Sequence, residues 1–97
     1  MADRVSDEKL KEKLDELSMW GLENGKLASR VEFESYSECV EFANKVFSIA
    51  EEENHHPEIM VEYGAVEIDL WSHEENTITE KDLEVAELIE EGLRDMD

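Results

Sequence analysis

Residues 54–73 read NHHPEIMVEYGAVEIDLWSH, and this stretch decides how the chain folds. Pro57 cannot continue a helix and biases His56 towards an extended conformation, so any preceding helix ends here. Beyond Pro57, residues 58–63 and 65–73 are predicted strands, and Gly64 supplies the turn between them. In the second strand apolar and polar residues alternate, which predicts a sheet with one covered face.

The segment before this stretch is predicted to form a helix over residues 36–53, because its apolar residues recur at helical spacing. Ser35 and Glu38 have the spacing of a capping box at its start. Further upstream, Asn24-Gly25 is a strong turn signal between strands expected at 20–23 and 26–34.

Two further helices are expected, one near each end of the chain. The first covers about residues 7–18, with Ser6 as its N-cap. The last begins at Thr79, where Asp82 completes a second capping box. The sequence therefore predicts an α+β fold, a four-stranded antiparallel sheet with three helices on one face, in the order α-β-β-α-β-β-α. Its length of 97 residues suits one domain, residues 1–97.

The charge of the chain is extreme for its size. Asp and Glu number 28 against 9 Lys and Arg, which gives a formal net charge of −19. Such self-repulsion weakens a compact state in dilute buffer and becomes tolerable in concentrated salt. We therefore expect a salt-adapted, halophilic protein. An acidic mimic of nucleic acid or an acidic tail would be the alternative, but the acids are spread over every segment. Direct binding of nucleic acid is disfavoured, since phosphate contact needs clustered Lys and Arg.

The single cysteine and the absence of apolar runs indicate the compartment. Cys39 cannot form an intrachain disulfide, which fits a reducing interior, and it falls on the apolar side of its predicted helix. Residues 1–7 carry no apolar signal segment, and no stretch approaches membrane-spanning length. A cytoplasmic location without membrane contact is expected.

All three histidines of the chain fall into one short pattern. Histidine exchanges protons near neutral pH, so their convergence indicates proton-transfer chemistry. Each residue has a simpler explanation by itself, such as surface exposure or helix capping. A zinc site ranks lower, because adjacent histidines are poor joint ligands. Neither an activated nucleophile nor a glycine-rich phosphate loop is present. The pattern comprises Glu51, His55, His56, Pro57, Tyr63, His73 and Asp82.

These residues, in this order, resemble the signature of the pterin-4a-carbinolamine dehydratase family, which also includes a dimerisation cofactor of a homeodomain transcription factor. The likeness covers nearly the whole chain. It extends to Leu17 with Trp20, to Val31-Glu32-Phe33, to Ser72-His73 and to the segment from Thr79 to Leu83. The chain departs from the family at Thr77-Ile78-Thr79, where Gly-Leu-Thr is common, and its loop after His73 is short, so loop 74–78 is expected to alter the rim of the pocket.

The resemblance implies a dehydratase that converts 4a-hydroxytetrahydropterin to quinonoid dihydropterin and water, with no metal or organic cofactor. It implies dimers joined through the sheet, often tetramers. His55 and His73 would be the acid and base, and His56 would position the substrate. Supporting or substrate-binding roles fall to Glu51, Asn54, Pro57, Tyr63, Trp71, Ser72, Glu74 and Asp82.

Two other functions stay open from the sequence. One is a non-enzymatic dimerisation or accessory protein, since the family includes a transcription-factor partner. The other is a pterin-related role in molybdenum cofactor metabolism.

Overall fold

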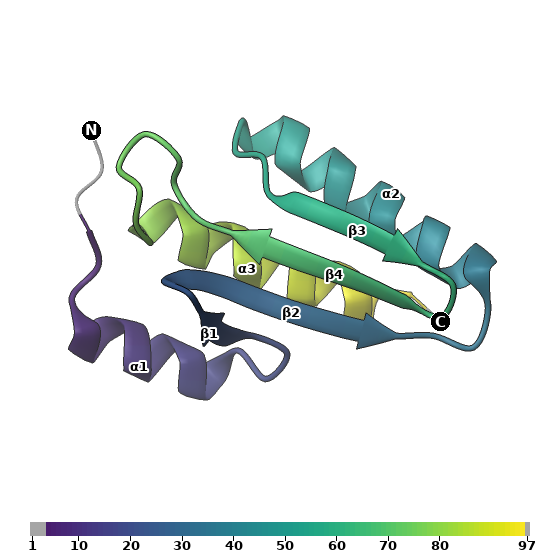
Figure 1. Cartoon of the computed structure of the whole chain (residues 1–97), viewed down its shortest axis with the longest axis horizontal. Helices are drawn as coiled ribbons and strands as arrows, with labels where there is room; N and C mark the ends of the chain where they lie inside the picture. The colour runs from purple at the N-terminus through teal and green to yellow at the C-terminus, as the bar shows by residue number, and fades with distance from the viewer. Residues whose placement is uncertain (1–3, 97) are drawn as a thin grey trace.

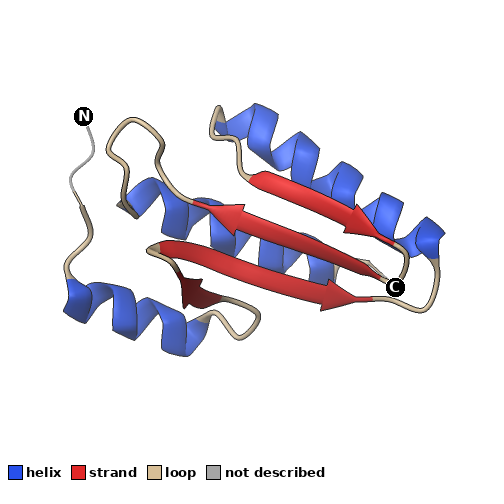
Figure 2. Cartoon of the chain, viewed as in Figure 1, coloured by secondary structure: helices blue, strands red, loops and turns tan. Residues whose placement is uncertain are grey.

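The computed structural model describes residues 4–96, and Figures 1 and 2 show the arrangement of its helices and strands. All neighbouring strands pair antiparallel, in the spatial order β1-β2-β4-β3. The predicted α+β class and the order α-β-β-α-β-β-α are confirmed. In chain order the elements are α1 (Asp7–Glu16), β1 (Gly21–Glu23), β2 (Lys26–Glu32), α2 (Tyr36–Glu53), β3 (Glu58–Glu62), β4 (Ala65–Leu70) and α3 (Glu80–Arg94).

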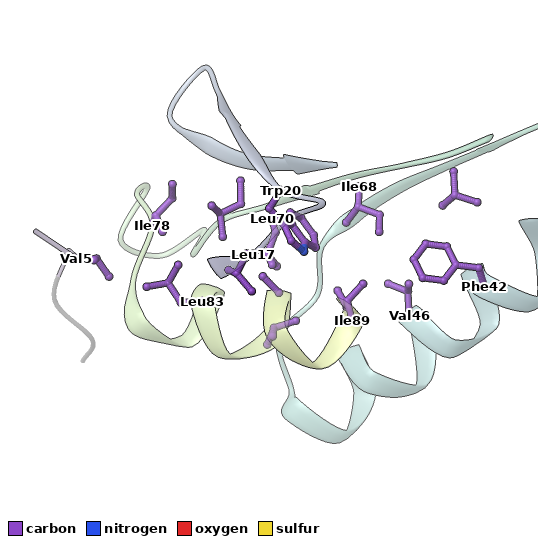
Figure 3. Close-up of a cluster of buried hydrophobic side chains, with 14 of the residues drawn as sticks. Val5, Leu17, Trp20, Phe42, Val46, Ile68, Leu70, Ile78, Leu83 and Ile89 are labelled. Carbon is purple, nitrogen blue, oxygen red and sulfur yellow. The ribbon is translucent and has the colours of Figure 1, made fainter. Parts of the chain in front are cut away.

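The core lies between the sheet and the helices. Helices α2 and α3 run behind the three longer strands, and α1 lies beside β1 (Figure 1). Phe42 and Val46 of α2 meet Ile68 of β4 and Ile89 of α3 in one buried cluster (Figure 3). Burying such a side chain contributes about 1.5–3 kcal/mol, so this contact holds the helices against the sheet. Within residues 4–96, no helix has both the length and the apolar character needed to cross a bilayer.

The opposite face of the sheet is polar. Glu67 of β4 alternates with the buried Val66 and Ile68, as the sequence predicted. Arg30 of β2 pairs across the strands with Glu62 (3.0 Å) and with Glu67. This face therefore carries charge, whereas the helix side carries the core.

Both expected capping boxes have their defining contacts. At α2, Ser35 Oγ accepts from the Glu38 backbone N–H at 3.2 Å, and Glu38 accepts from the Ser35 backbone N–H at 3.1 Å. At α3, Asp82 Oδ2 accepts from the Thr79 backbone N–H at 2.8 Å. These bonds satisfy backbone donors that the first turn of a helix leaves unpaired.

Four elements end earlier than the sequence predicted. Strands β2 and β3 stop at Glu32 and Glu62 and not at residues 34 and 63. Helix α1 stops at Glu16 and not at residue 18, because Leu17 leaves the helical region with φ −94° and ψ 86°. Strand β4 stops at Leu70 and not at His73. An isolated bridge between Ser72 and Thr77 closes the following loop. The loop turns the chain back towards α3, so the segment after Leu70 lies at the end of the sheet.

Candidate active site

A cavity of about 480 Å³ lies where β4 leaves the sheet. The end of α2 contributes Asn54, His55 and His56 to its lining. The segment after β4 contributes residues 71–75, and the start of α3 contributes Thr79 and Lys81. All three histidines of the chain therefore meet at one cavity, although His73 is 17 residues or more from the other two.

The way α2 ends places His55 at this cavity. Asn54 adopts a left-handed conformation, φ 51° and ψ 45°, which asparagine tolerates better than most residues. The Asn54 N–H then bonds to the Glu51 carbonyl at 3.3 Å, and the His55 N–H bonds to the Ala50 carbonyl at 3.0 Å. This pair of bonds is the Schellman motif, which satisfies the last carbonyls of the helix. The backbone of His55 thus closes α2, while its side chain remains available to the site.

His55 and Asp82 form the inner pair of the site. His55 Nε2 lies 2.5 Å from Asp82 Oδ1, and the carboxylate is fully buried. The other oxygen, Asp82 Oδ2, accepts from Ser72 Oγ and from the Thr79 N–H, both at 2.8 Å. Thr79 Oγ1 lies 2.8 Å from Ser72 Oγ and completes the network. Because Oδ2 is held by these donors, Oδ1 is fixed towards His55.

His56 and Glu51 form the outer pair. His56 Nε2 lies 2.7 Å from Glu51 Oε2, and both side chains are exposed. The sequence expected Glu51 to orient one of the imidazoles, and the structure pairs it with His56. Both pairs therefore join an imidazole to a carboxylate, but the inner pair is buried and the outer pair is exposed.

His73 is held differently from the other two histidines. Across residues 4–96, no hydrogen bond engages its ring nitrogens. Its ring is stacked on Trp71, with ring centroids 4.1 Å apart and planes inclined by 10°. Both nitrogens are consequently free to contact a bound molecule.

Lys81 brings a cation to the cavity, and sequence reasoning did not assign it to the site. Its ammonium donates to Glu53 Oε1 at 2.8 Å. This hydrogen bond raises the pKa of Lys81 above its ordinary value, so the side chain stays charged at neutral pH. The pairing depends on α2 and α3 lying side by side, and no local pattern around Lys81 reveals that.

The remaining expected site residues divide between the cavity and places away from it. Asn54, Trp71, Ser72 and Glu74 line the cavity, whereas Pro57 lines a neighbouring shallow pocket together with His56. Tyr63 was expected to support or bind the substrate, but within this chain it lies apart from the cavity. It lies at the far end of β3, 83% exposed and outside the lining. An extended strand advances about 3.3 Å per residue, so Tyr63 lies roughly 20 Å from Pro57.

The arrangement suits proton transfer to and from one bound molecule. Imidazoles can act as acid or base near neutral pH, and a carboxylate partner fixes the ring and stabilises its protonated form. In the described part of the chain, residues 4–96, no three or more His, Cys, Asp and Glu side chains are grouped to hold a metal ion. The cavity presents acid–base groups in a wall of mixed polar and apolar character.

The chain is similar to known proteins over most of its length. The family described as pterin 4 alpha carbinolamine dehydratase matches residues 3–92. Three relatives are provisionally named pterin-4-alpha-carbinolamine dehydratases. The one from Sulfolobus acidocaldarius is 38% identical, covering 89% of this chain and 94% of the relative. The one from Natronomonas pharaonis is 36% identical, with coverages of 94% and 97%. The one from Hahella chejuensis is 40% identical, with coverages of 92% and 83%.

A solved structure shares the fold. It is a crystal structure described as a transcriptional coactivator/pterin dehydratase from Brucella melitensis. It superimposes with a TM-score of 0.86 at 27% identity and covers 93% of this chain and 98% of its own.

Proposed function

Because the chain belongs to the pterin-4-alpha-carbinolamine dehydratase family, whose members are hydro-lyases, we propose that it converts 4a-hydroxytetrahydropterin to quinonoid dihydropterin and water. The observation that carries this proposal is the meeting of His55, His56 and His73 at one cavity. The volume of about 480 Å³ lies in the usual range of small-molecule sites.

The reaction needs two proton transfers. A base removes the proton from a ring nitrogen of the pterin, and an acid protonates the hydroxyl group as the C–O bond breaks. The electrons of the N–H bond form the new C=N bond, so neither oxidant nor reductant is required. His55 and His73 serve as the acid and base, because one is fixed by Asp82 and the other has both ring nitrogens free.

The other lining residues support the substrate. His56, oriented by Glu51, positions or polarises it at the cavity mouth. Trp71 offers an aromatic edge beside His73, and Asn54, Ser72 and Glu74 contribute polar atoms to the wall. Tyr63 is left out of this constellation because it lies at the far end of β3.

The protein is proposed to act as a homodimer or homotetramer in the cytoplasm. Strand β3 is an edge strand of the sheet, and Met60 at its centre is 56% exposed. An unpaired edge is a template for pairing with another strand. Light scattering on the purified protein at several concentrations would measure the assembly.

An accessory role is the second candidate, because the Brucella melitensis structure is also described as a transcriptional coactivator. Helix α2 exposes three large apolar side chains, Tyr36, Val40 and Phe47. Recovery of one stoichiometric partner, unaffected by replacing the histidines, would favour this role.

The dehydration assay tests the proposed function. The purified protein is expected to accelerate loss of the 4a-hydroxypterin absorbance, and His73→Ala is expected to slow the reaction by roughly 10² or more. Lys11→Gln, on the exposed side of α1, is the matched control and should retain full activity. A wild-type rate no faster than buffer would exclude the dehydratase.

Salt adaptation is tested in the same preparation. With a net charge of −19, repulsion between acids should fall as the Debye length shrinks from about 10 Å at 0.1 M to about 3 Å at 1 M salt. The free energy of unfolding, measured by urea denaturation, is expected to rise over this range. Greatest stability in dilute buffer would refute the adaptation.

A further inference from the structure

A lysine from another strand lies next to the Trp71–His73 stack. Lys26 Nζ is 3.9 Å from the centre of the Trp71 ring, and the Trp71 and His73 rings are nearly parallel at 4.1 Å. We propose that Lys26 and Trp71 are positioning residues that hold the His73 ring in its reactive orientation. We call Lys26, Trp71 and His73 the ring clamp.

The fold brings the ring clamp together through strand register. Leu27 of β2 pairs with Leu70 of β4, so the preceding Lys26 stands opposite the following Trp71. Beyond β4, Trp71 and His73 lie on one side of the chain, where their rings stack, although His73 already begins the turn over residues 73–76. Ser72, between them, points the other way and bonds to the buried Asp82.

Packing in the ring clamp, and not a hydrogen bond, holds the His73 ring in position. Its ring nitrogens form no hydrogen bond in residues 4–96, so packing against Trp71 fixes the ring plane. Offset aromatic stacking and a cation over an indole are both attractive. A ring held in this way keeps both nitrogens available to substrate, whereas a hydrogen-bonded ring would give one of them up.

Proton NMR of the histidine rings tests the ring clamp without relying on activity. The His73 signal is the one that His73→Gln removes. In Lys26→Met the His73 ring-proton signal is expected to move downfield, because the indole loses the cation packed over it and its stack with His73 loosens. Lys26→Arg should keep the signal at its wild-type position, since arginine also packs over aromatic rings. Lys11→Met, an exposed lysine on α1, is the matched control.

Trp71 is tested in the same spectra. In Trp71→Leu the His73 ring proton should move downfield as the ring current of the indole is lost, and Trp71→Phe should retain part of the effect. If the His73 signal in Lys26→Met stays where it is in Lys11→Met, and Trp71→Leu also leaves it in place, the ring clamp does not exist.

The kinetic consequence rests on the proposed function. Trp71→Leu should lower kcat by about 10-fold, the upper end of what an aromatic pair contributes, with a smaller change in KM. Trp71→Phe should recover most of the loss. A changed KM with an unchanged kcat would assign Trp71 to substrate binding and overturn its positioning role. Absence of dehydration in the wild type, with the NMR shifts as expected, would refute the proposed function alone and leave the ring clamp standing.

Discussion

The inner and outer imidazole–carboxylate pairs differ in burial far more than in geometry. The bonded atoms are 2.5 Å apart in the His55–Asp82 pair and 2.7 Å apart in the His56–Glu51 pair. The side chains of the inner pair are 16% and 0% exposed, whereas those of the outer pair are 57% and 79% exposed. From the distance between the bonded atoms alone, the two pairs would be expected to contribute about equally to stability and activity.

The difference teaches that surroundings decide what such a pair contributes. Exposed ion pairs are screened by water and salt, and they lose side-chain entropy when they form. In the inner pair, Ser72 and Thr79 donate to Asp82 Oδ2. Folding itself therefore fixes this carboxylate next to His55. We therefore expect the inner pair to matter for both stability and turnover, and the outer pair to have a small effect on turnover only.

Asp82→Asn should have the largest effect. An amide has one acceptor oxygen where the carboxylate has two. Either that oxygen faces Ser72 and Thr79, and His55 loses its acceptor, or it faces His55, and the other two donors lose theirs. The free energy of unfolding should fall by about 1–3 kcal/mol. Turnover should fall by roughly 10², because the protonated imidazole loses its counter-charge. Urea denaturation and the dehydration assay measure the two effects.

The outcome that would contradict this expectation is full activity in a destabilised Asp82→Asn protein. Asp82 would then act only as the capping residue of α3, and the inner pair would have no part in the chemistry. Glu51→Gln makes the same chemical change at an exposed site and is the matched variant for the comparison.

Ser72→Ala should have an intermediate effect. Removing the hydroxyl frees Asp82 Oδ2 from one of its donors but leaves the His55 contact in place. A net loss of about 1 kcal/mol is usual for such a bond, and activity should fall by about 3- to 10-fold as the carboxylate becomes mobile. Ser72→Thr retains the hydroxyl and should stay close to wild type. Equal losses in both variants would point to altered packing and not to the hydrogen bond.

Glu51→Gln should have the smallest effect. Because both members of the outer pair are exposed, we expect activity to change by less than about 3-fold at 0.1 M salt and unfolding to be unaltered. At 1 M salt, where the Debye length is about 3 Å, even this difference should disappear, while the Asp82→Asn defect should persist. A Glu51→Gln defect as large as that of Asp82→Asn would show that burial is not what separates the two pairs.

Local patterns in the sequence predicted most of the fold. The two capping boxes, the Asn24-Gly25 turn and the stop at Pro57 depend on residues close together in the chain, and the structure has each of them. The early end of β4 escaped prediction, because no glycine or proline interrupts residues 65–73 in the sequence, although the backbone stops pairing as a strand after Leu70.

The site was predictable in part. The histidines are rare and closely spaced, so they draw attention in the sequence. No local sequence pattern marks Lys26 or Lys81 as a site residue. The register of β2 with β4 places Lys26, and the packing of α3 beside α2 places Lys81. Tyr63 is the opposite case, a residue that the sequence pattern includes but the cavity does not. The length of β3 places it at the far end of that strand.

The Schellman motif at the end of α2 makes the length of that helix a functional constraint. Each residue of an α-helix advances 1.5 Å and turns about 100°. One residue inserted between Val46 and Ala50, with the packing of Phe42 preserved, would rotate both adjacent imidazoles by that angle away from the cavity. Homologous proteins can therefore vary exposed side chains of α2 other than Glu51, but insertions and deletions are expected to collect in the loops and not within this helix.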